Sequence, residues 1–168
     1  VNNFFNNLED AWSVVNNALQ LRGQATADST GRVLINSTIG VLGLVDVATG
    51  LRIERHTSNF GLTLGRWGVG PGPYIVLPLL GPSSLREVVA FPIDYRGNLV
   101  NSVTDTGTRD GLSVLDIVDT RASLLKAGQV VEEAALDSYS FIRDGYLQRR
   151  RNQVYDGNPP DEEMAPEP

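Results

Sequence analysis

The stretch from Leu64 to Glu87, LGRWGVGPGPYIVLPLLGPSSLRE, most restricts what this chain can fold into. It holds five glycines and four prolines in 24 residues, which is too many for one regular helix or a central strand. Loops rich in Gly and Pro usually face water and are polar, whereas most other positions here are apolar or aromatic. We therefore expect a stiff turn packed against apolar groups, with Tyr74–Leu77 as its extended part.

Apolar side chains recur at helical spacing on both sides of this stretch. The segments expected to be helical are 1–21, 25–39, 58–64, 84–91, 110–134 and 137–154. Ser84 and Glu87 have the spacing of a capping box at the start of the fourth segment, and Pro92 is expected to end it. Asp110 is expected to cap the fifth segment, and Gly23 to end the first. The sequence predicts a mainly α-helical fold.

The first segment has one apolar face and one Asn-rich face. The apolar side chains are Val1, Phe4, Phe5, Leu8, Trp12, Val15 and Leu19. Such a face usually packs in a protein core, but it also suits a membrane interface, where Lys or Arg is more common than Asn on the opposite side. The sequence leaves both readings open. The fifth segment likewise has an apolar face, which begins at Leu112.

Length and charge indicate one domain with a short tail. The chain of 168 residues can form one ordinary core, and we place the domain at 1–157 and a disordered acidic tail at 158–168. That tail carries four of the six net negative charges, so the body is nearly neutral and nucleic acid is not an expected partner. The most apolar stretch, 33–48, is interrupted by polar residues, so no membrane-spanning helix is expected.

The residues give little support for catalysis or for a metal. There is no Cys, and the single histidine, His56, stands among polar residues without a recognisable catalytic partner. The segment GVGPGPY lacks the Lys and the Ser or Thr of a phosphate loop, and its prolines remove amide donors. Asp116 and Asp119 fit charges on a helix surface better than an acid–base pair. We expect no enzyme activity, no cofactor and no metal.

A basic cluster lies on the last helical segment, where Arg149, Arg150 and Arg151 follow one another. Arginines near the C-terminal end of a helix interact favourably with the helix dipole on a solvated face. They also suit contact with anionic lipid headgroups or with an acidic protein partner. From the residues alone, the solvated face is favoured and the lipid contact stays open.

Four segments of the chain together form a recognisable pattern: NNFFNNLEDAWSVVNNALQ (2–20), GRVLINSTIGVLGLVDVA (31–48), NFGLTLGRWGVGPGPYIVLPLLGPSSLRE (59–87) and YLQRRRNQVYDG (146–157). These segments resemble the MlaA (VacJ) family of Gram-negative outer-membrane lipoproteins. They span nearly the whole chain in the order of the family, and the third is highly specific. The family also has a signal peptide, a lipidated Cys and a further helical segment before the position that matches Val1. We therefore expect this chain to lack the N-terminal part of the family fold.

The resemblance implies a mainly helical, ring-like single domain embedded in the outer membrane and facing the periplasm. It implies transport of phospholipid, in which mislocalised lipid leaves the outer leaflet and passes to the periplasmic carrier MlaC, maintaining lipid asymmetry. Trimeric porins are implied as partners, and a lipid anchor is implied for the full-length protein. The alternative reading is an outer-membrane scaffold that docks on porin and carrier without moving lipid.

The family resemblance also changes the expectation for the polar and basic residues. The Asn-rich face of the first segment would line a polar passage, and Arg149–Arg151 would contact phosphate headgroups. The Gly/Pro segment 67–82 would act as the gate of the passage, because glycines permit unusual backbone angles while prolines limit the remaining freedom. The residues expected in the gate or lipid path are Trp67, Gly68, Gly70, Gly72, Tyr74 and Pro78.

Overall fold

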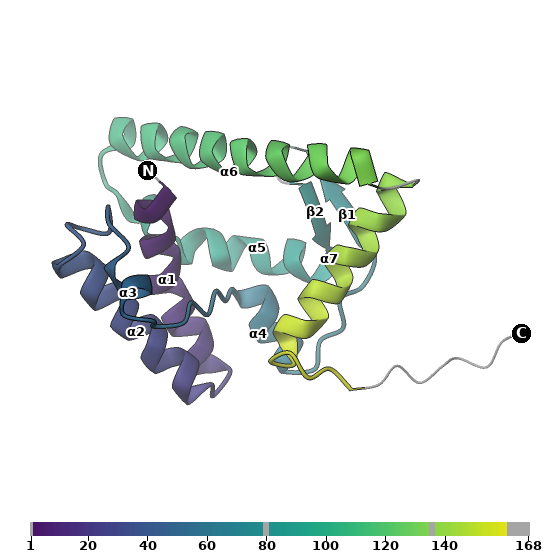
Figure 1. Ribbon diagram of the computed structural model, residues 1–168, viewed down its shortest axis with the longest axis horizontal. Coiled ribbons are helices and arrows are strands. Elements are labelled where there is room, and N and C mark those ends of the chain that lie inside the picture. Colours follow the sequence, from purple (N-terminus) through teal and green to yellow (C-terminus); the bar gives the residue numbers. More distant parts are fainter. Residues whose placement is uncertain (1, 79–80, 135–136, 161–168) are drawn as a thin grey trace, which may run out of the picture.

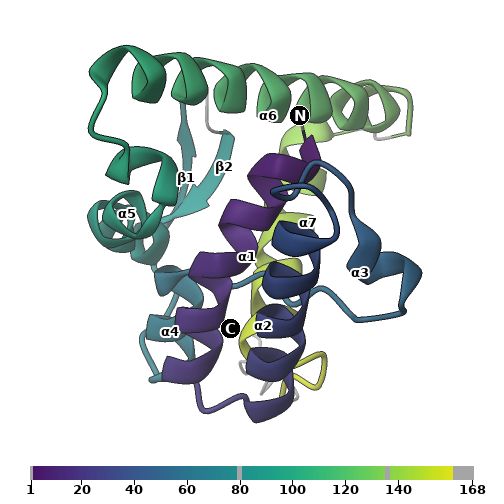
Figure 2. The same cartoon turned by 90° about the vertical axis from the view of Figure 1, so that its left-hand side faces the viewer.

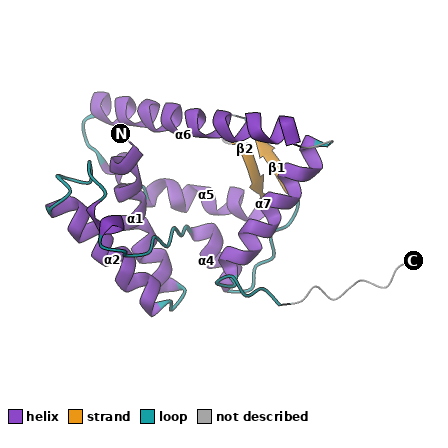
Figure 3. Ribbon diagram, in the orientation of Figure 1, coloured by secondary structure: helices purple, strands orange, loops and turns teal. Residues whose placement is uncertain are grey.

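The computed structural model describes residues 2–78, 81–134 and 137–160. Helices make up most of these residues, and one short β-hairpin is inserted between them (Figure 3). In chain order the elements are α1 (Asn2–Leu19), α2 (Gly23–Thr38), α3 (Val47–Gly50), α4 (Phe60–Arg66), β1 (Tyr74–Leu77), β2 (Gly81–Ser84), α5 (Leu85–Gly97), the 3-10 helix η1 (Leu99–Ser102), α6 (Thr106–Ala134) and α7 (Ser138–Val154). The expectation of a mainly helical fold is confirmed.

The elements surround the middle of the molecule rather than stacking in two layers. Helices α1 and α2 form an antiparallel pair on one side, while α7 and the hairpin lie on the opposite side (Figure 1). Helix α6 runs across one end of the other elements, and α5 lies below it with α4 packed against it (Figures 1 and 2). Among the described residues, no helix combines the length and the apolar character needed to cross a membrane.

The Gly/Pro stretch forms the hairpin and the turn that leads into it. Tyr74–Leu77 is extended as expected and pairs antiparallel with Gly81–Ser84, Tyr74 lying opposite Ser84. Gly68 and Gly72 have φ angles of 96° and 66°, which side-chain-bearing residues rarely adopt. The turn before β1 therefore depends on glycine at these two positions.

Several predicted helix ends were wrong. Leu21, with φ 58°, occupies the left-handed position after α1, and Gly23 is instead the first residue of α2. The Ser84 side chain makes no capping hydrogen bond, so no capping box forms. Helix α5 continues through the exposed Pro92 to Gly97, although proline cannot donate a backbone hydrogen bond within the helix.

The start of the long helix α6 also differs from the prediction. The helix begins at Thr106, with the Thr108 N–H donating to the Asp105 carboxylate, and Asp110 lies inside it. Up to residue 122, where side-chain burial is described for all but one residue of this helix, its apolar residues are not part of the core. Leu115 and Val118 are 50% and 59% exposed.

Side-chain burial is inverted relative to a water-soluble protein. Among the residues whose burial the structure describes, fifteen buried side chains are polar or charged and only seven are hydrophobic. In the same residues, 27 large apolar or aromatic side chains are exposed. On α1, Asn16 and Asn17 are fully buried while Val15 and Leu19 are more than 40% exposed. The polar face of α1 therefore packs inside the molecule, and its apolar residues divide between the inside and the outer surface.

Candidate functional site

A cavity of about 700 Å³ lies between α1, the hairpin, α5, α6 and α7. Its lining mixes polar and apolar groups. The polar and charged residues are Asn2, Asn6, Glu9, Ser58, Asn59, Ser83, Glu87, Asp94, Asn98, Asp119, Thr120, Arg149 and Arg150. The apolar residues are Phe5, Leu8, Trp12, Leu77, Pro82, Val88, Phe91 and Val100. We call this space the central cavity. It can hold a charged group and hydrocarbon at the same time.

Asp94 fixes the wall of the central cavity where three elements meet. Its Oδ1 accepts a hydrogen bond of 2.7 Å from the indole N–H of Trp12 on α1 and another of 2.7 Å from the Phe60 N–H at the start of α4. The ring of Trp12 lies directly against Gly97, where a Cβ would approach its carbon atoms to 2.4 Å. Helix α5 therefore approaches α1 closely because this position is glycine.

Glu87 forms the second junction of the wall. Its Oε2 accepts hydrogen bonds from Arg150 on α7 at 2.9 Å and from Asn59 at 3.0 Å, and its side chain is only 8% exposed. Gly61 makes room for this carboxylate, since a Cβ there would lie 2.3 Å from Oε2. The ion pair joins α5 and α7 through two residues that are 63 positions apart in the chain.

A second cavity, of about 860 Å³, opens between the turn before the hairpin and α7. Gly68, Val69, Gly70 and Pro71 line it from the turn, and residues of α7 line the opposite wall. Arg150 lines both cavities, so the Glu87–Arg150 ion pair stands between them.

The predicted gate residues divide between several environments. Gly68 and Gly70 line the second cavity, and a Cβ at either would meet no atom within 4 Å. Tyr74 packs edge-on against the rings of Tyr139 and Tyr146 on α7, which anchors β1. Trp67, 56% exposed, donates from its indole N–H to the Leu19 carbonyl at 3.3 Å.

The remaining two predicted gate positions lie at the ends of β1. A Cβ on Gly72 would lie 3.0 Å from the side chain of Leu85, and Pro78 is exposed at the turn after β1. Neither lines the two cavities, whereas Leu77 and Pro82 of the same hairpin line the central one.

The three arginines of the basic cluster do not share one surface. Arg149 lines the central cavity, Arg150 lines both cavities, and Arg151 lines the second one. Arg151 also donates to the Pro160 carbonyl at 2.6 Å. The cluster therefore faces two separate spaces instead of forming one solvated face.

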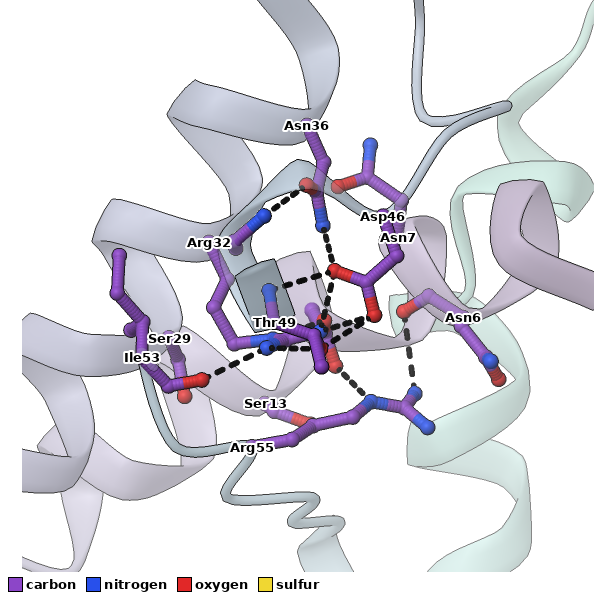
Figure 4. A network of polar contacts seen from close by, with 12 residues as sticks. Asn6, Asn7, Ser13, Ser29, Arg32, Asn36, Asp46, Thr49, Ile53 and Arg55 are labelled. Carbon is purple, nitrogen blue, oxygen red and sulfur yellow. Dashed lines mark hydrogen bonds and ion pairs between the residues drawn. The ribbon is translucent and has the colours of Figure 1, made fainter. Parts of the chain in front are cut away.

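A buried ionic network holds the other half of the molecule together (Figure 4). Arg32 on α2 is 2% exposed and donates to Asp10 on α1 at 3.3 Å and to both carboxylate oxygens of Asp46 at 2.9 and 3.0 Å. Arg55 donates to the other oxygen of Asp10 at 2.7 Å. Burial raises the pKa of Asp46, but hydrogen bonds from Thr49, Arg32 and Asn36 outweigh burial and lower it to about 2.

The Asn-rich face of α1 mainly forms hydrogen bonds inside the protein, with α2, α4 and the segment before α4. Asn17 donates to Ser29 on α2 and to the His56 carbonyl, and Asn16 accepts from Thr63 on α4. Of this face, Asn2 and Asn6 line the central cavity. His56 is half-buried, and its Nε2 lies 3.1 Å from a carboxylate oxygen of Asp28.

Sequence reasoning did not find Glu87 and Asp94 of the central cavity as site residues, nor Arg86, which lines the second cavity. Glu87 was assigned to a capping box because Ser84 stands three residues before it. The partners of these side chains lie between 17 and 82 residues away in the chain, at Val69, Arg150 and Trp12. No local spacing identifies such partners.

The comparisons with known proteins agree with one another. Residues 1–153 match the MlaA lipoprotein family. The intermembrane phospholipid transport system lipoprotein MlaA of Escherichia coli K12 is 33% identical over 155 residues, which cover 89% of this chain and 60% of that protein. An uncharacterised Rickettsia bellii protein is 36% identical over 157 residues, covering 92% of this chain and 61% of its own. The chain thus spans about three fifths of these relatives.

A solved structure has the same fold. It comes from work on the structural basis for maintenance of bacterial outer membrane lipid asymmetry, and it superposes with a TM-score of 0.73 at 31% identity, covering 94% of this chain and 78% of that one. The sequence matches and the shared fold lead to one assignment: this chain belongs to the MlaA lipoprotein family.

Proposed function

We propose that this chain is the helical body of a phospholipid transport protein of the outer membrane, seated from the periplasmic side as a ring-like domain. Its task is to remove mislocalised phospholipid from the outer leaflet, which maintains lipid asymmetry. The observation that carries the proposal is the central cavity, which has charged and apolar groups on one wall and lies inside a fold whose outer surface is rich in apolar side chains.

The inverted burial supports a position in hydrocarbon rather than in water. Exposed apolar patches beyond a few hundred Å² mark interaction or membrane surfaces. The turn after α2 alone exposes five large aliphatic side chains by more than half of their area: Ile39, Val41, Leu42, Leu44 and Val45. A protein embedded in one leaflet needs no spanning helix, because its apolar rim meets the acyl chains sideways.

The mixed lining of the central cavity supports passage of an amphipathic molecule. A lipid headgroup needs polar partners on its route, while its tails need apolar contact. Arg149 and Arg150 supply positive charge in the central cavity, beside the carboxylates of Glu9, Glu87, Asp94 and Asp119. Phe5, Leu8 and Phe91 supply apolar surface. We assign headgroup contact to Arg149, Arg150 and Arg151, the last from the side of the second cavity.

We assign the gate to the segment 67–82. Open space around Gly68 and Gly70 allows the turn to move, and Gly72 adds a backbone angle that other residues resist. Trp67, Tyr74 and Pro78 delimit the moving part, with Tyr74 anchored to α7 through its ring contacts. The gate would rotate about the glycines and alter access to the central cavity through Leu77 and Pro82.

The proposed partners and the route after the gate are those that the resemblance to the MlaA family implies. The lipid would pass to the periplasmic carrier MlaC, and a trimeric porin would hold the domain in the membrane. The full-length protein would carry the lipid anchor. The proposal gives the chain no catalytic step and no cofactor.

The gate is tested in the full-length protein by combining Gly70→Pro with Gly72→Pro. Proline fixes φ near −65°, which Gly72 at 66° cannot match, so phospholipid should accumulate on the cell surface. The matched control is Gly70→Ala, whose added methyl group meets no atom within 4 Å. Wild-type levels of surface phospholipid in the double variant, at normal expression, would show that this segment is no gate.

Headgroup contact is tested by changing Arg149, Arg150 and Arg151 together to Gln. Lipid transfer to the carrier should fall, whereas Arg96→Gln on the exposed side of α5 should leave it unchanged. Equal transfer by both variants would remove the assignment.

The alternative function is a scaffold that docks on porin and carrier without moving lipid. The surface apolar side chains that support a membrane position also suit protein contact. Mass spectrometry of the purified complex separates the two functions. Phospholipid that co-purifies with the wild type but not with the triple Gln variant favours transport, and porin binding without lipid favours the scaffold.

A further inference from the structure

Two buried hydrogen-bond donors stand without partners on the wall of the second cavity. The Ser84 hydroxyl and the Nε of Arg86 form no hydrogen bond with the described residues, although these residues are only 2% and 7% exposed. Both line this cavity from the start of α5. Buried donors in a folded protein are nearly always bonded, so two unpartnered ones two residues apart indicate a missing acceptor.

The existing contacts hold the Arg86 side chain in place but leave its Nε–H without an acceptor. Its Nη1 donates to the Val69 carbonyl at 3.0 Å, while its Nη2 lies 3.8 Å from Oε1 of Glu87. The better-placed oxygen of Glu87 already accepts from Arg150. Gly65 leaves the space that the guanidinium fills, since a Cβ there would approach Nη1 to 2.8 Å.

The charge around the second cavity also favours an anion. Arg86, Arg150 and Arg151 line it, and among its described lining residues only Asp144 carries a negative charge. Burial lowers the pKa of Arg86, the Glu87 carboxylate raises it, and the nearby Arg150 lowers it again, so that the net change is downward. Burial is the main cause of the lowered pKa, and the Glu87 carboxylate does not offset it.

We propose that the second cavity is a phosphate-binding site, in which the Ser84 hydroxyl and the Arg86 Nε–H donate to phosphate oxygens while Arg150 contributes charge. A phosphate monoester or diester supplies several acceptor oxygens and matches a guanidinium better than a halide does. The proposed headgroup contacts of Arg150 and Arg151 also reach this cavity, but the site adds Ser84 and Arg86 as donors, which the transport proposal does not use. The chemistry is common to a lipid headgroup and to soluble phosphate.

Equilibrium binding to the purified protein in dodecyl maltoside tests the site, with ³¹P NMR titration as the readout. The probes are inorganic phosphate, glycerol 3-phosphate and dihexanoylphosphatidylglycerol. Ser84→Ala should weaken binding about fivefold, because it removes one neutral donor. Its thermal stability should stay level or rise, since the hydroxyl has no partner in the fold. Arg86→Lys keeps the charge but loses the fixed N–H, and it should weaken binding about tenfold.

The matched controls are Ser113→Ala and Arg96→Lys, which lie outside both cavities on α6 and α5. Saturable binding of the soluble phosphates and the lipid, weakened in the Ser84 variant, supports a general phosphate site. Binding of the lipid alone would identify the ligand as a lipid headgroup. Binding of the soluble phosphates alone would identify the ligand as soluble phosphate. No saturable binding, or equal affinity in the Ser84→Ala and Ser113→Ala variants, overturns the proposal. Because Ser84→Ala leaves the fold contacts intact, the test stands even where Arg86→Lys does not fold.

Discussion

Replacing Asp46 by Asn tests whether the buried ionic network sets the stability of the α1–α2 half. The Asp46 carboxylate caps α3 through the Thr49 N–H and accepts two hydrogen bonds from Arg32. Asparagine is close in size but neutral. It keeps one carbonyl acceptor, but its amide nitrogen replaces the second acceptor oxygen, so the change removes the ion pair together with the hydrogen bonds that this oxygen accepts.

The expected loss in the free energy of unfolding follows from the lowered pKa of Asp46. Lowering it from 3.8 to about 2 corresponds to about 2 kcal/mol at neutral pH, at about 1.4 kcal/mol for each pKa unit. The side chain is 31% exposed, so solvent screening reduces the expected loss to about 1–2 kcal/mol. The loss stays below the roughly 3–5 kcal/mol of a fully broken buried pair, because Asp10 remains as a carboxylate partner of Arg32.

Denaturant unfolding in dodecyl maltoside, followed by circular dichroism at pH 7 and pH 3, measures this loss. A carboxylate with a lowered folded-state pKa stabilises above its unfolded pKa, and that stability disappears as the pH falls through about 2. The difference between wild type and Asp46→Asn should therefore fall to roughly half at pH 3. Asp110→Asn, an exposed change on α6, is the control and should show almost no difference. A difference that is absent at pH 7, or equal at both pH values, would refute the reasoning.

The other predictions concern the junctions around the central cavity, and the same unfolding assay measures them. Glu87→Gln should lower stability by about 2–3 kcal/mol, because Arg150 loses its buried counter-ion; a loss below about 0.5 kcal/mol would contradict this. Gly61→Ala should lower stability by about 1–3 kcal/mol, because its methyl group would collide with the Glu87 carboxylate. Gly23→Ala is the control, because its methyl group meets no atom within 4 Å and the change should be neutral or stabilising. Equal effects of the two changes would contradict the packing argument. Trp12→Phe should lower stability by about 1–3 kcal/mol, because the Asp94 carboxylate on α5 loses the hydrogen bond from the indole N–H. An unchanged unfolding midpoint would count against a contribution of this hydrogen bond.

The helices could be predicted from the sequence because their apolar side chains recur at a local spacing. The same spacing did not say which face is inside. On α1 it grouped Val15 with Trp12 on one apolar face, yet Val15 is 44% exposed while Asn16 and Asn17 are fully buried. A hydrophobic pattern identifies the interior only when the surroundings are water. The pattern alone therefore could not place these helices.

The site was harder to predict than the helices, because its contacts join distant residues. The Gly/Pro segment could be identified as special from composition, and its strand was predicted correctly at Tyr74–Leu77. The partner of that strand, Gly81–Ser84, contains a Pro and shows no strand pattern, so the hairpin was missed. The ion pair of Glu87 with Arg150 depends on α7 returning to α5, which no short stretch of sequence encodes.

The inverted burial also explains why polar contacts, not apolar ones, determine how α1 lies on α2. Three hydrogen bonds run along this interface, from Asn7 to Ser37, from Arg32 to Asp10 and from Asn17 to Ser29. Apolar contact is non-directional and tolerates sliding of one helix along another, whereas hydrogen bonds fix the register. Under the proposed membrane position, lipid would solvate the exposed aliphatic side chains equally well in either register. The specificity of the helix pair would then depend on the buried amides, hydroxyls and charges.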